Sequence, residues 1–441
     1  MFLLCFSILV VFLYIFSPGI LSYDSYNQLE QIKTHNFSNW HPFLHTFIEM
    51  VLLKIWNDTS VIGLFQITIF SLIWTAICHY NRNEGLKNYL LQLLVILIIC
   101  FNPINFLYAI TLWKDILYSY SILFVCFLLQ ILVDKKYKVN KKYIVLLGLS
   151  LAFMSKIRYN GLYITIVLLA VLMILLFRKV KKHYLLLFLT TLLGIGAISS
   201  LDIIFNVENN EKSAIEPKVM QYITFFIKKD KLSKKDLKSV SEIAKIDELL
   251  DSYKYSYTDE LYSVINHKKY KKNQNKMIKL CLKYTFKHPI LSMKFAINST
   301  SFIWDPTFPK DRVGLILSTD ITSLNNTDNV RPYHSERRYY AIVNSKINKT
   351  LNNDFLKIIL YSAALYFYLT IIICIILAIK YKYRTFLILL PNTLNLIVVA
   401  LSNPIHDIRY IYPNILLFYF VLLILIKKIG EKSKKKIKKS K

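Results

Sequence analysis

Acidic residues are scarce in this chain: its 441 residues include 27 Asp and Glu against 56 Lys and Arg, which gives a formal net charge of +29. Such an excess of positive charge could indicate a nucleic-acid-binding protein. However, the basic residues stand in short clusters between apolar runs and in the tail "KKIGEKSKKKIKKSK". Clusters of this kind are typical of the cytoplasmic loops of membrane proteins, so we expect no nucleic-acid partner.

Cysteine is also sparse and has no pattern. Of the six cysteines only Cys281 lies in a polar region, and no CxxC pair occurs. The sequence therefore supports neither a disulfide framework nor a zinc knuckle. The N-terminus "MFLLCFSILVVFLYIF" lacks a basic n-region and a small-residue cleavage site. We interpret it as a retained first membrane span rather than a signal peptide.

Apolar residues dominate what is present, with 55% hydrophobic residues and a mean hydropathy of +0.40. These values predict an all-α polytopic protein that crosses the cell membrane several times. The length rule predicts about ten transmembrane helices, at 2–20, 59–80, 87–103, 112–133, 143–157, 161–177, 184–204, 356–379, 385–401 and 410–426. As one helix, 87–133 would be roughly 70 Å long, so we expect a break near Asn102-Pro103.

The apolar runs divide the chain into four parts. We predict an N-terminal transmembrane bundle at 1–204, which includes a first outer loop at 21–58, and a polar, mainly helical segment at 205–355. C-terminal transmembrane helices at 356–426 and a basic tail at 427–441 complete the chain. In the first loop, 41–56 reads as an amphipathic interfacial helix. The apolar periodicity of 277–304 suggests helices resting on the membrane surface, and a plain soluble helical domain is the alternative.

The distribution of Lys and Arg predicts the orientation. They concentrate in every second loop and in the tail, which the positive-inside rule assigns to the cytoplasm. The first loop and the polar segment are then extracytoplasmic. The predicted spans hold almost no ionisable residue near their midplane, and the remaining ionisable groups fall at the outer ends. Transporters usually carry such groups at the bilayer centre, so this pattern favours an enzyme that acts on a lipid-anchored substrate at the outer leaflet.

The first outer loop carries two candidate sites. Asp24, in "YDSYNQ", could act as a general base or help to hold a divalent cation, and the alternative is a helix N-cap. His41, His45 and Glu49 recur every four residues, so one helix face would present all three. That spacing could hold a metal such as zinc or manganese, or form the polar stripe of an interfacial helix.

Two further motifs join the first loop at the outer side. Lys114 and Asp115, in "LWKDILYS", could bind a phosphate and orient a hydroxyl; the alternative is snorkelling beside a helix-start acid. Arg158 and Asn160 lie in "SKIRYNGLY", where basic residues in a short outer loop need a reason. A lipid phosphate would supply one, with Arg158 as a bidentate clamp, and a tight turn is the alternative.

The last outer loop, "NPIHDIRYIYP", contributes Asp407, Arg409 and Tyr410 as candidate substrate contacts. An Asp–Arg ion pair that closes the helical bundle is the alternative. Asp305 in "WDP" and the stretch "RPYHSERRYY" at 331–340 are weaker candidates.

The order of "YDSYNQ…NWHP", "WKD", "RYNG" and "RYIYP" resembles the GT-C class of integral-membrane glycosyltransferases. That class includes the protein O-mannosyltransferase and aminoarabinose transferase relatives, and the pattern is similar to uncharacterised multi-pass envelope proteins of Gram-positive bacteria. The resemblance covers about 20–205 and 385–415. It implies a GT-C-like bundle with a catalytic acid in the first outer loop and a polyprenyl-phosphate-linked sugar donor.

Carried over residue by residue, Asp24 resembles the catalytic acid and His41-Pro42 the His-Pro that follows it. Lys114-Asp115 resembles the outer polar pair near the donor phosphate, which makes Asp115 the second catalytic candidate. The class commonly has Asp-Glu where this chain has Asp24-Ser25. The expected function is inverting transfer of a sugar to an envelope glycan, lipid or protein acceptor on the outer face. The alternatives are a polymerase or flippase of lipid-linked oligosaccharide and a non-catalytic scaffold.

Overall fold

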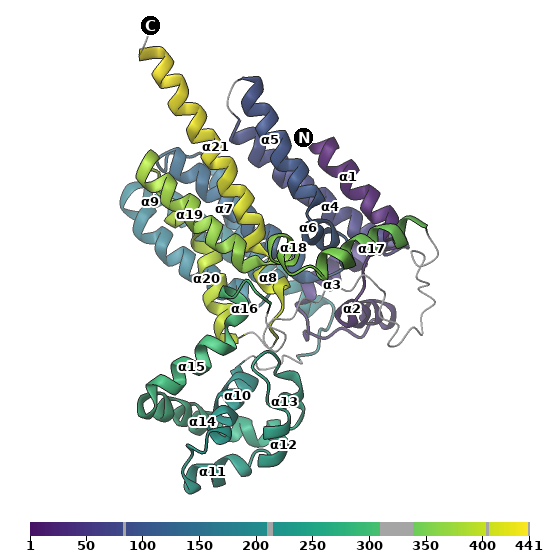
Figure 1. Ribbon diagram of the computed structural model, residues 1–441, viewed down its shortest axis with the longest axis vertical. Helices are drawn as coiled ribbons and strands as arrows, with labels where there is room; N and C mark the ends of the chain where they lie inside the picture. Colours follow the sequence, from purple (N-terminus) through teal and green to yellow (C-terminus); the bar gives the residue numbers. More distant parts are fainter. Residues whose placement is uncertain (83–84, 210–214, 309–337, 403–404, 440–441) are drawn as a thin grey trace. The chain divides into compact units, whose positions relative to one another are not determined.

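The computed structural model describes residues 1–82, 85–209, 215–308, 338–402 and 405–439 (Figure 1). In these ranges the chain is helical and forms only isolated β-bridges, which confirms the all-α prediction. It divides into two compact units, each described here by itself. Unit 1 comprises 1–211, 317–395 and 412–441, and unit 2 comprises 212–316 and 396–411.

Five helical segments are long and apolar enough to cross a membrane: α4 (Ser60–Tyr80), α7 (Lys114–Asp134), Lys181–Ile204 of α9, α19 (Ala363–Tyr381), and Ile408–Ser433, which includes most of α21 (Pro413–Lys439). A bent helix pair makes a possible sixth. Shorter apolar helices are α1 (Phe2–Ile15), Asn160–Leu175 of α9 and α20 (Phe386–Ser402). The chain is therefore a helical membrane protein, and ten spans remain a prediction.

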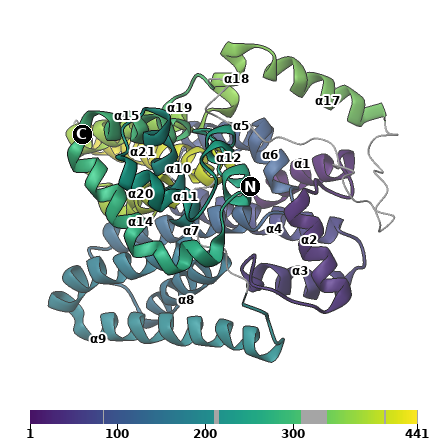
Figure 2. The same ribbon diagram turned by 90° about the horizontal axis from the view of Figure 1, so that it is seen from below.

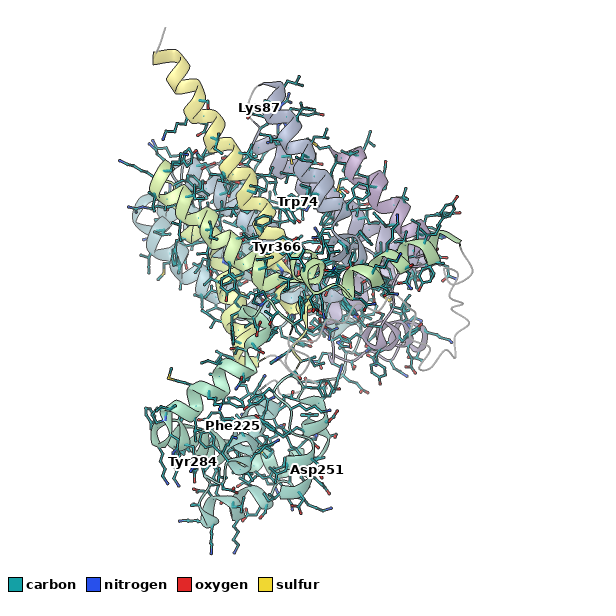
Figure 3. All side chains as sticks on the ribbon, in the orientation of Figure 1. Trp74, Lys87, Phe225, Asp251, Tyr284 and Tyr366 are labelled. Atoms are coloured by element: carbon teal, nitrogen blue, oxygen red, sulfur yellow. The ribbon has the colours of Figure 1, made fainter. Side chains whose placement is uncertain are left out.

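The bent pair consists of α5 (Leu86–Phe101) and α6 (Pro103–Ala109), which meet at 66°. This confirms the predicted break at Asn102-Pro103. The Asn102 side chain stabilises the bend from both sides. Its Oδ1 accepts a hydrogen bond from the Ile104 N–H at 3.0 Å, and its Nδ2 donates to the Tyr366 hydroxyl at 3.0 Å. Tyr366 is labelled in Figure 3. A side-chain amide that caps one helix and bonds another leaves few polar groups unsatisfied at this depth.

Helix α9 (Asn160–Ile204) folds back along α8 (Lys141–Ile157), as Figure 2 shows. The Ser155 hydroxyl lies 2.8 Å from the hydroxyl of Thr165 in the first half of α9. Gly148 packs against Thr190 in the second half so closely that a Cβ would lie 2.0 Å from its Oγ1. Both halves touch the same stretch of α8, so the chain reverses between them, as the two predicted spans at 161–177 and 184–204 require.

Asp134 is the last residue of α7, at the opposite end of the helix from Lys114. Its carboxylate accepts hydrogen bonds from Tyr383 at 2.7 Å and from Tyr80 at 3.2 Å, and it pairs with Lys427 of α21 at 3.2 Å. The basic loop at 135–142 follows directly. This cluster, which we call the Asp134 node, holds the ends of helices from both halves of the sequence together.

The segment predicted as the first outer loop forms α2 (Tyr23–Thr34) and α3 (Phe43–Ile55), and α3 covers most of the helix predicted at 41–56. The segment before α2 is paired with the segment before α7. The Ile20 N–H donates to the Ile110 carbonyl at 2.9 Å, and the Leu112 N–H donates to the Ile20 carbonyl at 3.0 Å. This ladder fixes the start of α2 against the start of α7.

The polar segment predicted at 205–355 is divided in the structure. Helices α17 (Arg338–Leu351) and α18 (Asp354–Tyr361) belong to unit 1, where Tyr340 packs edge-on against Phe16. The predicted span at 356–379 is also interrupted, because the Ser362 hydroxyl accepts from the Leu365 N–H and caps a new helix, α19. An apolar run therefore contains a helix boundary that hydropathy alone does not reveal.

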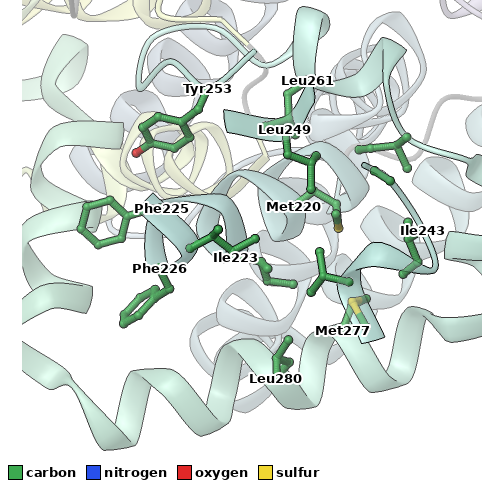
Figure 4. Close-up of a cluster of buried hydrophobic side chains, with 14 of the residues drawn as sticks. Met220, Ile223, Phe225, Phe226, Ile243, Leu249, Tyr253, Leu261, Met277 and Leu280 are labelled. Carbon is green, nitrogen blue, oxygen red and sulfur yellow. The ribbon is translucent and has the colours of Figure 1, made fainter. Parts of the chain in front are cut away.

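Unit 2 is a small helical domain with a core of its own (Figure 4). Its elements are α10 (Ile215–Lys228), α11 (Lys234–Ser241), α12 (Ile246–Asp251), α13 (Asp259–Ser263), α14 (His267–Lys287), α15 (Pro289–Ser299), α16 (Ser301–Trp304) and the 3-10 turn η1 (Ile408–Ile411). Met220, Phe225 and Phe226 of α10 belong to the same buried cluster as Met277 and Leu280 of α14. Each such buried side chain contributes about 1.5–3 kcal/mol.

Gly19→Ala tests the ladder. Gly19 has a φ of +114°, and a Cβ there would lie 3.0 Å from Leu112 Cδ1 and 3.1 Å from the Ile110 carbonyl oxygen. We expect a loss of about 1–3 kcal/mol, because the backbone strain adds to a clash with the neighbouring segment. The measurement is the thermal unfolding midpoint in detergent. Gly196→Ala is the control, since nothing lies within 4 Å of its Cβ position. Equal midpoints for the two variants would contradict this account.

Candidate functional site

Asp24 and Lys114 form the centre of the candidate site. The Lys114 Nζ lies 3.5 Å from Asp24 Oδ2 and 3.0 Å from His41 Nδ1, and His41 Nε2 lies 3.9 Å from Asp24 Oδ1. Side-chain exposure is 25% for Asp24, 15% for Lys114 and 8% for His41. The carboxylate is thus the most accessible of these three side chains.

The local sequence explains how Asp24 reaches Lys114. Ser25 donates a 2.7 Å hydrogen bond to the Leu112 carbonyl, and the Trp113 indole N–H donates to the Ser22 hydroxyl at 2.5 Å. Asp24 lies between these two serines in the first turn of α2, and Lys114 follows Trp113 as the first residue of α7. Two anchored helix starts therefore bring the carboxylate and the ammonium together.

Asp115 and Arg158 form the second charged pair. Arg158 ends α8, and its Nη1 lies 2.8 Å from Asp115 Oδ1, while the guanidinium carbon lies 5.4 Å from the centre of the Tyr118 ring. The Asp115 side chain is 1% exposed and that of Arg158 is 11% exposed. Since Asp115 follows Lys114 directly, the two ion pairs lie side by side at the N-terminus of α7, where the helix dipole adds positive potential.

Helix α3 turns its polar face inward. His45 and Glu49 are completely buried, whereas Val51 and Ile55 are 40% and 76% exposed. His45 Nδ1 lies 3.6 Å from Glu49 Oε1. Burial, assisted by the charges of Lys114 and His41, lowers the pKa of His45 to about 3, and burial raises the pKa of Glu49 well above its usual range. Both shifts favour the uncharged forms.

The predicted metal site at His41, His45 and Glu49 is not reproduced. In the part of the chain that the structure describes, no group of three or more His, Cys, Asp or Glu side chains could hold a metal ion. The physical reason is that α3 begins only at Phe43, so His41 precedes the helix and does not share its face. His41 turns to Asp24 and Lys114 instead.

An apolar cavity of about 610 Å³ is lined by residues of α4, α7 and α8. On α7 its lining includes Leu117 and Tyr120, two and five residues after Asp115, and on α8 it includes Phe153, five residues before Arg158. The rest of the lining is almost entirely apolar. Helices that carry the charged residues of the candidate site therefore also line an apolar space.

Unit 1 also contains the predicted residue Asn160 and a further ion pair between Lys156 and Asp202. Asn160 is half-buried at the first turn of α9. Asp202, near the end of α9, pairs with Lys156 of α8 at 3.3 Å. This second Lys–Asp bridge ties the two helix ends together beside Arg158.

Asp407, Arg409 and Tyr410 belong to unit 2. Arg409 Nε lies 3.1 Å from Asp407 Oδ2, and its Nη2 donates to the Tyr410 hydroxyl at 2.9 Å. His406 stacks on Phe302, and its Nε2 lies 2.8 Å from the Ser299 carbonyl. The contacts of Asp407 and Arg409 fit the alternative, a structural Asp–Arg ion pair. Substrate contact by these residues stays a prediction. Residues 309–337, with most of "RPYHSERRYY", lie outside the described ranges.

Sequence reasoning missed Tyr118 and Gln28. Tyr118 lies four residues after Lys114 on α7, and its hydroxyl donates to Asn395 at 3.0 Å while its ring meets Arg158. Gln28 donates to the Thr46 hydroxyl at 2.9 Å and so joins α2 to α3. The i, i+4 spacing from Lys114 could have indicated Tyr118, because such residues share a helix face. Nothing in the sequence indicated Gln28.

Fold and site together define a helical membrane protein with a compact charged cluster at the end of one long helix. A family model described as a family of unknown function, DUF6020, matches residues 32–440, and the chain belongs to this family. The matched range contains His41, Lys114, Asp115 and Arg158 and begins after Asp24. No curated protein and no solved structure matches the chain.

The buried His45–Glu49 pair predicts a pH-dependent effect of Glu49→Gln. The raised pKa of Glu49 means that, above about pH 4.5, the unfolded chain releases a proton that the folded chain keeps, so wild-type stability falls as pH rises. Gln removes this loss. We measure the difference between the unfolding midpoints of the variant and the wild type. We expect this difference to be more favourable to the variant at about pH 8 than at about pH 5. Glu30→Gln, at an exposed site on α2, is the control. If the unfolding midpoint of the variant instead falls further below that of the wild type at high pH, Glu49 is ionised in the folded protein.

Proposed function

We propose that the protein is a GT-C-like glycosyltransferase that moves a sugar from a polyprenyl-phosphate donor to an acceptor hydroxyl at the outer face of the membrane. The observation that carries the proposal is the convergence of Asp24, Lys114, Asp115 and Arg158 at the N-terminus of α7. Neither an ion-coupled path through the bilayer nor a simple scaffold needs a partly exposed carboxylate paired with a lysine at the end of a helix.

The chemistry follows from these groups. Asp24 takes the proton of the acceptor hydroxyl as its oxygen attacks the anomeric carbon. The bond between that carbon and the phosphate oxygen breaks, and the electron pair leaves with the lipid phosphate. Lys114 and Arg158 stabilise the growing negative charge, assisted by the α7 dipole. A phosphate leaving group needs little protonation, so the reaction requires cations more than a general acid.

Asp115 acts as a positioning residue for Arg158. Its carboxylate lies 2.8 Å from the guanidinium and is almost fully buried, so it fixes the orientation of the Arg158 side chain. Tyr118 supports the same guanidinium with its ring. Holding a planar guanidinium in one orientation reduces the entropy lost when it binds phosphate through two hydrogen bonds.

The cavity of about 610 Å³ suits the lipid part of the donor. Its lining is apolar, and it begins within one or two helix turns of the charged groups. A phosphate held by Lys114 and Arg158 would therefore extend its hydrocarbon chain along α7 into this space. A donor with no lipid would leave the cavity unused.

The Asp134 node supports the sidedness of this proposal. It lies at the end of α7 opposite to Lys114, together with the basic loop at 135–142 and Lys427 of α21. A membrane-length helix of 21 residues separates the two ends. By the positive-inside rule the node and the tail at 427–441 face the cytoplasm, and the candidate site is extracytoplasmic.

Asp24→Asn tests the role of the base. The amide keeps the shape of the side chain but cannot accept the hydroxyl proton, so we expect transfer to fall by at least about a hundredfold with normal expression. Mass spectrometry of envelope glycans and glycolipids from cells with the variant or the wild type measures the product. Glu30→Gln on the same helix should keep full activity. Full activity of Asp24→Asn would overturn the mechanism.

Arg158→Lys tests the clamp. The charge remains but the paired donors are lost, so we expect the donor KM to rise by about tenfold or more. Arg82→Lys, an exposed change at the Asp134 end, is the control. An unchanged KM would remove Arg158 from the donor site. In the same glycan profiles, loss of a single sugar supports transfer, whereas shorter repeat chains would support the polymerase alternative.

A further inference from the structure

Unit 2 exposes a stripe of large apolar side chains on the last turns of α14 and along α15. The stripe consists of Leu282, Phe286, Ile290, Met293 and Ile297, which are 53%, 83%, 80%, 64% and 50% exposed. Successive members are three or four residues apart, so within each helix they share one face. We call these five residues the apolar stripe.

The apolar stripe is not a part of the core of unit 2. The opposite faces of the same helices already supply that core, through Met277, Leu280 and Tyr284 of α14 and Phe295 of α15. In Figure 4 the side chains of Met277 and Leu280 point from α14 into the cluster. The stripe is therefore a second apolar surface, and its exposure to water would be unfavourable.

Lysines border the apolar stripe. The exposed basic residues on these two helices nearest to it are Lys279, Lys283, Lys287 and Lys294. Lys283 is held by Asp236 at 2.6 Å, and the other three extend the positive charge along the stripe. Long basic side chains beside exposed apolar groups are the pattern of helices that lie in a membrane interface, where the lysines reach lipid phosphates. Protein interfaces are instead depleted in lysine.

We propose that the apolar stripe inserts into the headgroup region of a bilayer that contains anionic phospholipid, with Lys279, Lys287 and Lys294 on the lipid phosphates. The chain keeps this unit near a bilayer, because the membrane-length segment Lys181–Ile204 precedes it and α20 follows it. The proposal is independent of the glycosyltransferase function, since it rests on residues of unit 2 alone. It agrees with the expectation that the helices of 277–304 rest on the membrane surface.

Photo-crosslinking in the full-length protein tests the insertion. p-Benzoylphenylalanine replaces Phe286 or Ile290, and the protein is reconstituted in nanodiscs of phosphatidylethanolamine and phosphatidylglycerol. Position 98, a 47% exposed residue of the apolar helix α5, is the positive control. Position 251 on α12, an exposed charged site apart from Tyr284 and α14 in Figure 3, is the negative control. We expect lipid adducts by mass spectrometry at 286, 290 and 98, several-fold above those at 251.

The results that would overturn the proposal are distinct. Lipid adducts at 98 but not at 286 and 290 would exclude insertion. Crosslinks from 286 or 290 to the same chain or to a second copy would show that protein covers the stripe. All crosslinking positions are exposed, so the fold is retained and each result is interpretable.

The contribution of charge needs a second comparison. Combining Lys279→Glu, Lys287→Glu and Lys294→Glu should lower the adduct yield at 286 in discs that contain phosphatidylglycerol. Replacing phosphatidylglycerol by phosphatidylcholine should lower the yield of the parent protein in the same way but not that of the triple variant, whose glutamates are repelled by the anionic lipid. Equal yields from parent and triple variant in the anionic discs would overturn the role of the lysines.

Discussion

Pairing of charges at the start of α7 is the constraint on which the candidate site depends. Lys114 and Asp115 are consecutive, and each is neutralised by a residue from a different element, Asp24 of α2 and Arg158 at the end of α8. Removing one partner of the buried Asp115–Arg158 pair would leave an uncompensated charge, which is strongly destabilising, whereas the Asp24–Lys114 pair is partly exposed. The two pairs therefore link α2 and α8 to the start of α7 and bring together the groups on which the proposed chemistry depends.

The sequence allowed the residues of the site to be predicted, but not their partners. Asp24, Lys114, Asp115 and Arg158 stood out because ionisable groups are rare beside apolar runs. Helix spacing relates residues of one element only, and contacts between elements depend on packing. The same limit explains the metal prediction: the four-residue spacing is sound for His45 and Glu49, but His41 precedes the helix. The break at Asn102-Pro103 was predictable because proline and helix length both require it.

Two amphipathic helices show why a pattern does not determine which face is buried. In α3 the polar face is inside, where His45 and Glu49 lie near the charged groups of the site, and Val51 and Ile55 face outward. In α15 the apolar residue Phe295 joins a core while Ile290 and Met293 remain outside. Water would penalise both arrangements. A lipid environment rewards exposed apolar groups, so the surroundings of each helix, rather than its periodicity, set its orientation.

The Asp134 node bears on how the protein is made. Asp134 ends a helix from the first third of the chain, whereas its partners Tyr383 and Lys427 are synthesised much later. Until α21 leaves the ribosome and enters the bilayer, this carboxylate lacks its cation. Assembly of unit 1 is consequently a late, post-insertion event. A chain that stops before α21 would leave Asp134 without this cation.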